Sequence, residues 1–320
     1  RLDHTPAPSG KKPCEDPIEC LTPEETLAAV KGKKILSVER CNEATKARIL
    51  RDFGIVVEDV KYAELNAAWE KIPYDLAAAK VMEWQRTAVA IKDVSTETLL
   101  GVAKMFYAMQ NVLAARKAVA ISIDCLGGCY TGKLKAYPCL GFMELQDLGL
   151  FGTCENDIRS TVAMVVFNAM TKGRMGYISD PVIDSSRRAI SFAHCVATRK
   201  FFGPQGPTAE YQILTHSEDR QGASVQSFAP VDYPVTTVQF HFFGAGEKGC
   251  LLVQSGRIIG NDLDDRACRT KILAEIPGDF ERVYKLWDLW GWHRVTFIGD
   301  FRKSVEALGK KLGYRMIYED

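Results

Sequence analysis

Up to about residue 130, predicted strands and helices alternate along the chain, and this alternation restricts the fold more than any other feature. Thr22-Pro23-Glu24-Glu25 has the pattern of a capping box with proline at the first helical position, and it predicts a short helix that ends before Gly32. Such alternation is typical of a parallel sheet with helices on its faces, so we expect an α/β domain at residues 21–130. The expected strands lie at 34–38, 55–60 and 118–124, and the expected helices at 43–53, 75–90 and 96–115.

The pattern changes in residues 131–320, which we assign to a second domain. Two helices are expected first, one from Pro138 to Gly149 and one over about 157–172. A strand at 293–298 and a helix at 301–312 are expected last. Between them, short apolar runs bounded by Gly, Pro and Asp predict a mixed or antiparallel sheet, with strands at 189–192, 211–214, 225–228, 235–243, 249–255 and 257–259.

Residues 1–20 contain four prolines and show no hydrophobic periodicity, so we predict an arm or linker there. The 320 residues are 47% apolar, and 41 Lys plus Arg against 40 Asp plus Glu leave a net charge of +1. This balance disfavours binding to nucleic acid or to an anionic membrane. No apolar run reaches the roughly 20 residues that a membrane span needs.

The ten cysteines are scattered through predicted strands and helices, which is typical of reduced thiols in a cytoplasmic protein. Two pairs, Cys14 with Cys20 and Cys125 with Cys129, lack the two-residue gap of a zinc or thioredoxin motif. We interpret both pairs as ordinary buried or loop thiols.

One glycine-rich segment, Gly127-Gly-Cys-Tyr-Thr-Gly-Lys133, follows a predicted strand and has the spacing of a phosphate-binding loop. However, Leu134 stands where the magnesium-binding Ser or Thr belongs, and Pro138 interrupts the helix whose N-terminus would hold the phosphate. We therefore interpret the segment as glycine-rich bends near a substrate cleft.

Carboxylates and a histidine stand at the ends of predicted elements in the second domain. Glu155 and Asp157 lie at the start of a predicted helix, where backbone N–H groups and the helix dipole favour their charged forms. Asp180 follows a short apolar segment and His194 ends an apolar strand, so both are expected to project into one cleft. Converging carboxylates and imidazoles predict a divalent-metal site.

The remaining histidines and tryptophans have competing interpretations. A histidine that ends an apolar strand, as His194 does, is more often a hydrogen-bonded core residue than a ligand. His293 heads the last predicted strand, and His216 follows another, where its ring would suit a sugar hydroxyl. We interpret His241 as structural. Core packing is favoured over stacking on a sugar for three tryptophans, Trp287, Trp290 and Trp292.

Together these segments resemble the L-fucose isomerase and L-arabinose isomerase superfamily, particularly its fucose-isomerase-related members. The resemblance covers nearly everything after residue 30 and implies an α/β fold with two parts, a Rossmann-like parallel-sheet domain followed by a mixed α/β fucose-isomerase-like C-terminal domain. The motifs that carry it are Phe53-Gly54, Pro138-Cys139, Cys154-Glu155-Asn156-Asp157, Asp180-Pro181, Ala193-His194-Cys195, His293 and Gly299-Asp300.

The resemblance also implies roles for individual residues. The ligands of a Mn²⁺ or similar divalent ion would be Glu155, Asp180, His293 and, as the additional histidine of the arabinose-isomerase branch, His194. The same two carboxylates, Glu155 and Asp180, would be the catalytic acid–base groups. We assign three further residues to contacts with the sugar: His216, Cys139 and Asp157.

The residues and the resemblance predict a metal-dependent aldose–ketose isomerase that acts on a pentose or a 6-deoxyhexose through an ene-diol. Family members usually begin with a further Rossmann-like domain that helps build a neighbouring subunit's site. We accordingly expect a homo-oligomer, a trimer or hexamer, and a separate N-terminal domain or chain as a candidate partner. Two alternatives stay open: a non-catalytic sugar-binding or regulatory subunit, and an aldolase or dehydratase that uses the same metal.

Overall fold

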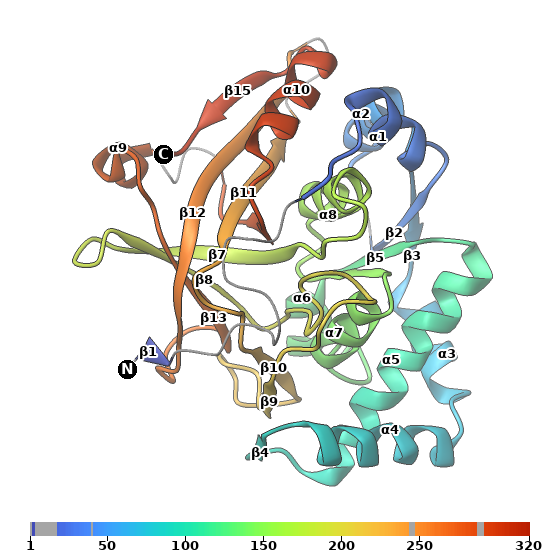
Figure 1. Cartoon of the computed structure of the whole chain (residues 1–320). Coiled ribbons are helices and arrows are strands. Elements are labelled where there is room, and N and C mark those ends of the chain that lie inside the picture. Colours follow the sequence, from blue (N-terminus) through green and yellow to red (C-terminus); the bar gives the residue numbers. More distant parts are fainter. Residues whose placement is uncertain (1, 4–17, 40, 243–246, 287–290) are drawn as a thin grey trace.

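The computed structural model describes residues 2–3, 18–39, 41–242, 247–286 and 291–320, and it contains three sheets, with most of the helices gathered around the parallel sheet (Figure 1). Most of the predicted arm at 1–20 lies outside the described residues, as do Cys14, Trp287 and Trp290. Within those ranges, every helix is too short or too polar to cross a membrane.

The first part of the chain forms the expected parallel sheet, in the order β3-β2-β5-β6. Helix α1 (Pro23–Val30) begins with the predicted capping box, in which the Thr22 hydroxyl accepts from the Glu25 N–H and the Glu25 carboxylate accepts from the Thr22 N–H. Helix α2 (Glu43–Phe53) ends at Gly54, which has a φ of 68°. The strands are β2 (Lys34–Val38), β3 (Val56–Val60), β5 (Ala120–Ile123) and β6 (Phe151–Thr153).

Helices cover the parallel sheet, and α5 packs against α3, α4 and α7. Helix α8 lies between this sheet and the strands of the second half, where the Phe167 ring stacks on Phe240 with centroids 5.5 Å apart. Because β6 lies beyond residue 130, the parallel sheet uses a strand from the second half, and a division of the chain at 130 stays a prediction. These helices are α3 (Tyr62–Glu70), α4 (Tyr74–Thr87), α5 (Thr96–Arg116), α7 (Cys139–Asp147) and α8 (Ile158–Met170).

The second half forms a closed antiparallel barrel in the order β11-β14-β7-β8-β13-β12, which closes because β12 pairs with both β13 and β11. Two more strands lie along β12: β15 (Arg315–Tyr318) is parallel to it, and β1 (Leu2–Asp3) is antiparallel. The barrel strands are β7 (Tyr177–Asp184), β8 (Ala189–His194), β11 (Pro234–His241), β12 (Cys250–Asp262), β13 (Thr270–Glu275) and β14 (Arg294–Ile298).

The prediction of separate strands at 249–255 and 257–259 was wrong, because both belong to the continuous β12. Gly256 does not mark a turn. A Cβ atom there would stand 3.0 Å from the Glu275 carbonyl oxygen, so the glycine allows β13 to approach β12 closely. Strands β7, β13 and β15 were not predicted; β7 contains Pro181, which cannot donate to a neighbouring strand.

The glycine-rich segment after β5 is a short helix, α6 (Cys125–Tyr130), and not a loop. A Cβ atom on Gly128 would lie 2.6 Å from Leu134 Cδ1, so this glycine lets Leu134 fold back onto the helix. The remaining elements are β4 (Ala90–Lys92), β9 (Tyr211–Leu214) and β10 (Ser224–Ser227), which form the third sheet, and the helices α9 (Phe280–Leu286) and α10 (Arg302–Leu312).

A buried ionic network joins α7 to the segment that follows β8. The Arg199 guanidinium donates from Nε to Asp147 (2.5 Å) and from Nη2 to Glu144 (3.1 Å). The Arg199 backbone N–H also donates to Asp147, and Trp84 Nε1 of α4 donates to Glu144. Because β8 ends at His194, this network fixes the barrel relative to the helices close to the predicted site.

We expect Arg199→Met to lower the free energy of unfolding by about 3–5 kcal/mol, since it leaves buried Asp147 without its cation and leaves Glu144 with Lys80 alone. Urea unfolding measures this change. Arg187→Met is the matched control, because Arg187 pairs with Asp184 near the surface and its loss should cost less than about 1 kcal/mol. Equal losses in the two variants would contradict the structural importance of the network.

Candidate metal centre

Glu155 lies in a tight turn between β6 and α8. Both Glu155 and Asn156 have positive φ, 58° and 49°, a conformation that costs non-glycine residues roughly 1–3 kcal/mol. The turn is tied to neighbouring strands, because the Asn156 N–H donates to the Ile123 carbonyl oxygen (2.9 Å) and the Ser37 hydroxyl donates to the Asn156 side chain (3.0 Å). The parallel sheet thus holds Glu155 beyond its carboxyl edge.

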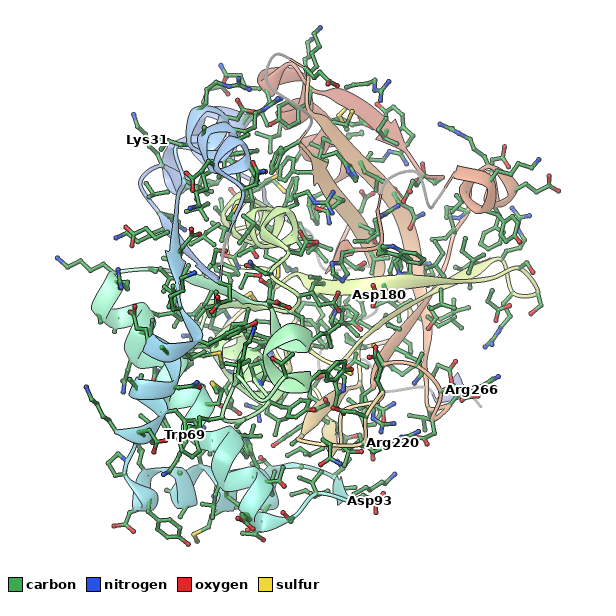
Figure 2. The ribbon with its side chains drawn as sticks, turned by 180° about the vertical axis from the view of Figure 1, so that it is seen from behind. Lys31, Trp69, Asp93, Asp180, Arg220 and Arg266 are labelled. Atoms are coloured by element: carbon green, nitrogen blue, oxygen red, sulfur yellow. The ribbon has the colours of Figure 1, made fainter. Side chains whose placement is uncertain are left out.

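The other three residues come from neighbouring barrel strands. Strand register pairs Ser179 with Arg294 and Asp180 with Ala193, which places His293 beside Asp180 on one side and His194 near it on the other. Seen from behind, Asp180 lies near the middle of the molecule, between the helices and the barrel (Figure 2). The barrel therefore presents Asp180 and both histidines toward the Glu155 turn.

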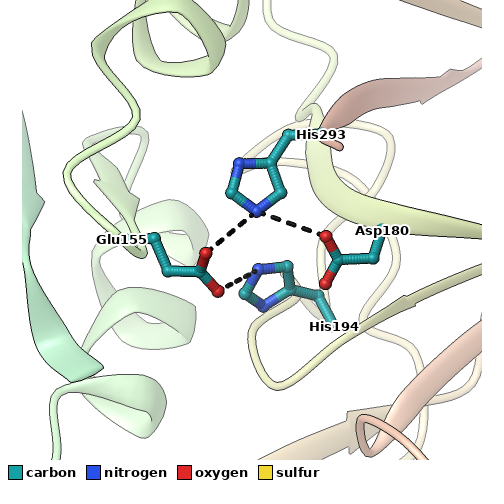
Figure 3. Close-up of side chains that lie close together, drawn as sticks. All are labelled: Glu155, Asp180, His194 and His293. Carbon is teal, nitrogen blue, oxygen red and sulfur yellow. Dashed lines mark ion pairs between the residues drawn. The ribbon is translucent and has the colours of Figure 1, made fainter. Parts of the chain in front are cut away.

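The four side chains that the resemblance names as metal ligands come together, and their role as ligands stays a prediction (Figure 3). One ligand atom from each of Glu155, Asp180, His194 and His293 can be chosen so that all lie within 4.8 Å of one another. His293 Nε2 is 3.4 Å from both Glu155 Oε2 and Asp180 Oδ1, and His194 Nε2 is 3.7 Å from Glu155 Oε1. Both imidazoles are buried, while both carboxylates are partly exposed.

Asp157 fixes the orientation of the His293 ring. Its Oδ2 atom accepts from His293 Nδ1 (2.9 Å), and in a neutral ring this leaves the lone pair on Nε2, facing Glu155 and Asp180. Its Oδ1 atom accepts from the backbone N–H groups of Arg159 and Ser160 and so caps α8. The structure thus places Asp157 behind His293 and gives it a positioning contact; its assigned contact with the sugar stays a prediction.

Two further residues hold His293 in place. The Ser160 hydroxyl donates to Asp157 Oδ2 (2.7 Å), and Gln239 of β11 donates from Nε2 to both the Ser160 hydroxyl and the His293 carbonyl oxygen. The ring and the backbone of His293 are therefore fixed by α8 and by a barrel strand. Sequence alone gave no sign of Ser160 or Gln239, because their partners are far away along the chain.

The charges of the cluster favour a cation. Burial lowers the pKa of His293, but the hydrogen bond with Asp157 and the nearby Glu155 carboxylate outweigh burial and raise that pKa to about 10. The adjacent His293 ring lowers the pKa of Glu155, whereas burial raises the pKa of Asp180. Without a metal, a proton on His293 Nε2 supplies positive charge between the two carboxylates, and a metal must displace it.

His194 differs from His293 in the use of its ring nitrogens. The Nδ1 atom of His194 accepts from the Cys195 backbone N–H (2.9 Å), and burial lowers the pKa of the His194 ring. The ring is therefore neutral and carries its proton on Nε2, which faces Glu155. For His194 to bind a metal through Nε2, the contact with Cys195 must break. His293 is therefore the better-prepared of the two nitrogen ligands.

The cluster faces a cavity of about 770 Å³ at the carboxyl ends of the parallel strands. Its wall includes the charged residues Arg159 and Glu218, which the sequence analysis did not identify. Trp292 also lines the cavity; it is 68% exposed, so the prediction that it packs in the core was wrong. Residues after β2 and β5 also contribute, as expected where parallel strands end. They are Cys41, Asn42, Thr45 and Leu126.

Two residues assigned to sugar binding do not line this cavity. His216 donates from Nδ1 to Asp219 (3.0 Å) in the loop after β9, and Cys139 is buried in the first turn of α7. Their assigned contacts stay predictions. His241 is buried beside Arg159, consistent with a structural position.

The donor set fits a divalent cation. Carboxylate oxygens and imidazole nitrogen are ligands that Mn²⁺ and similar ions accept, and no cysteine belongs to the cluster. His293 Nε2 is buried and makes no hydrogen bond with the described residues, although two carboxylates stand 3.4 Å away. A buried ring nitrogen without a hydrogen-bond partner beside two carboxylates fits the role of a cation ligand.

No family model matches the sequence. The chain is similar to a sulfoquinovose isomerase of Alkalicoccus urumqiensis, with 24% identity over 146 residues, which is 45% of this chain and 32% of that protein. It is also similar to sulfoquinovose isomerases of Priestia aryabhattai and Priestia megaterium, with 20% identity over 155 residues, or 48% of this chain and 34% of theirs. The aligned part spans about a third of the length of these curated relatives.

We expect His293→Ala to weaken Mn²⁺ binding more than His194→Ala does, because Asp157 holds His293 Nδ1 so that Nε2 can bind a cation once its proton is displaced, whereas His194 must first break its contact with Cys195. Isothermal titration calorimetry with Mn²⁺ measures both affinities. A larger loss in His194→Ala would show that the His194 ring turns over to bind the metal.

Asp157→Asn should lower Mn²⁺ affinity by about 10- to 100-fold, since it removes the charge that orients His293. The asparagine oxygen still caps α8, but its amide nitrogen cannot accept from His293 and Ser160, so the free energy of unfolding in urea should fall by about 1–3 kcal/mol while the protein stays folded. Unchanged Mn²⁺ affinity in a folded variant would mean that Asp157 does not control the His293 ring.

Proposed function

We propose that this chain is part of a metal-dependent aldose–ketose isomerase of the L-fucose and L-arabinose isomerase superfamily, acting on a pentose or a 6-deoxyhexose. The observation that carries the proposal is the convergence of Glu155, Asp180 and His293 on one point at the wall of a cavity. The names of the similar proteins, sulfoquinovose isomerases, support isomerisation of a sugar.

Glu155, Asp180 and His293 would hold the cation, with His194 as the fourth residue of the site. A divalent ion bound there would act as a Lewis acid on the oxygen atoms of the open-chain sugar. Asp157, Ser160 and Gln239 would keep His293 in the orientation that binding requires.

The two carboxylates suit the proton transfers of the reaction. Glu155 comes from the parallel sheet and Asp180 from the barrel, so they approach the cavity from different sides (Figure 3). One carboxylate takes the proton from C2 of the aldose, the C2 electron pair forms the C1–C2 double bond, and O1 gains a proton. A proton then returns to C1 while O2 loses its proton, which gives the ketose without net oxidation.

The cavity fits a monosaccharide. Its volume of about 770 Å³ lies within the range of roughly 300–1,000 Å³ typical of small-molecule sites. Exposed Trp292, next to His293, offers an apolar face for the sugar carbons, and Arg159 and Glu218 offer polar contacts for hydroxyl groups. Pentoses, 6-deoxyhexoses and sulfoquinovose are therefore the substrates to test. The expected homo-oligomer and separate N-terminal domain or chain stay part of this proposal.

Removal of the metal should abolish turnover, and Mn²⁺ should restore it, because the ligand cluster then regains its cation. Assays of aldose–ketose interconversion before and after chelation measure this effect. Full activity of protein shown by elemental analysis to be free of metal would refute the proposal.

Glu155→Gln and Asp180→Asn should each lower turnover by about 10²- to 10⁴-fold, since both remove a proton acceptor. Asp184→Asn is the matched control: Asp184 lies on the same strand as Asp180, but it pairs with Arg187 outside the cavity. Interconversion in ²H₂O should place deuterium at C1 of the ketose. Sugar binding without turnover would favour the non-catalytic alternative, and cleavage products would favour an aldolase.

A further inference from the structure

Two buried thiols contact each other directly beside the metal cluster. Cys125 begins α6 at the end of β5, and Cys154 follows the end of β6. Their Sγ atoms are 2.9 Å apart, and the two residues are only 5% and 4% exposed. The proposed chemistry at Glu155 and Asp180 does not use either thiol.

The parallel sheet brings these thiols together. Strands β5 and β6 are neighbours, with Ser122 opposite Thr153, so Cys154 follows β6 level with the last residue of β5, and Cys125 lies two residues further on, in the first turn of α6. The two side chains converge from these positions until their Sγ atoms are 2.9 Å apart. Formation of the bond needs the sulfurs to approach by less than about 1 Å.

Cys154 is also next to Glu155 in the chain. The intervening turn is already strained, with positive φ at Glu155 and Asn156, and it is tied to β2 and β5 by hydrogen bonds. Such a turn has few ways to absorb a shift of Cys154 without moving the adjacent carboxylate.

We propose that Cys125 and Cys154 form a reversible disulfide that lowers the affinity of the adjacent site for a divalent cation. This inference rests on the metal site of the proposed function. The oxidant is a small-molecule disulfide: one cysteine displaces a thiol from it to form a mixed disulfide, and the second cysteine displaces the other thiol. Two protein thiols are oxidised, one disulfide is reduced, and two small thiols leave with the protons.

Cys139 offers an alternative partner, because hydrogen bonds with Cys125 and Cys139, together with burial, raise the pKa of Cys154. Cys125 is favoured by strand geometry, since it follows the neighbouring strand, whereas Cys139 belongs to α7. The experiment must therefore identify which pair is linked.

The full chain is incubated with oxidised glutathione, and the linked peptides are mapped by mass spectrometry without reduction. We expect a Cys125–Cys154 link, a fall in Mn²⁺ affinity of about tenfold or more, and recovery of affinity with dithiothreitol. Cys125→Ser should abolish both the link and the fall in affinity, and Cys125→Ala repeats the test if the serine variant does not fold. Cys250→Ser, which removes a buried thiol from β12, should behave as the unchanged protein.

Three outcomes would overturn the inference: no link, a link between Cys139 and Cys154, or a Cys125–Cys154 link with unchanged Mn²⁺ affinity. The mapped link and the Mn²⁺ affinity do not depend on turnover. If both behave as expected while every sugar remains unconverted, the inference holds and the proposed isomerase activity fails.

Discussion

The candidate site depends on the hydrogen bond between His293 Nδ1 and Asp157 Oδ2. Asp157 begins α8, which packs on the parallel sheet, whereas His293 precedes a strand of the barrel. One carboxylate therefore caps a helix, orients an imidazole and joins the two parts of the fold. Without this bond, nothing in the ring itself would direct Nε2 toward Glu155 and Asp180, and the three groups would not face a common point.

The electrostatics of the site follow from this arrangement. Three carboxylates, Glu155, Asp157 and Asp180, surround His293, and their repulsion is relieved only by positive charge. In the protein without a metal, these carboxylates raise the pKa of His293, so that the ring binds a proton and becomes positively charged. A divalent ion would supply more charge at the same place and would allow the ring to bind through its lone pair. Without a metal, the positive charge at this place comes from the proton on His293.

Local signals in the sequence predicted much of the first half. The capping box at Thr22 and the left-handed Gly54 act within one helical turn, so their effects can be read without knowledge of the fold. The barrel was harder to predict. Pro181 in β7 and Gly256 in β12 are residues that usually interrupt strands, so the local sequence there does not predict a continuous strand. Both strands form nevertheless, because contacts with distant strands outweigh local preference.

By itself, the sequence determined the long helices and the parallel strands β2, β3 and β5, although not α3, α6 or β6. Acids and histidines at element ends, together with the family resemblance, pointed to the four residues that meet at the centre. Only the tertiary structure decided how they are used. Strand register placed His293 beside Asp180, and packing of α8 brought Asp157 to the His293 ring. The backbone N–H of Cys195 donates to His194 Nδ1, which leaves the proton of the neutral His194 ring on Nε2. These outcomes depend on atoms from distant segments meeting within hydrogen-bond distance, and no local preference specifies such a meeting.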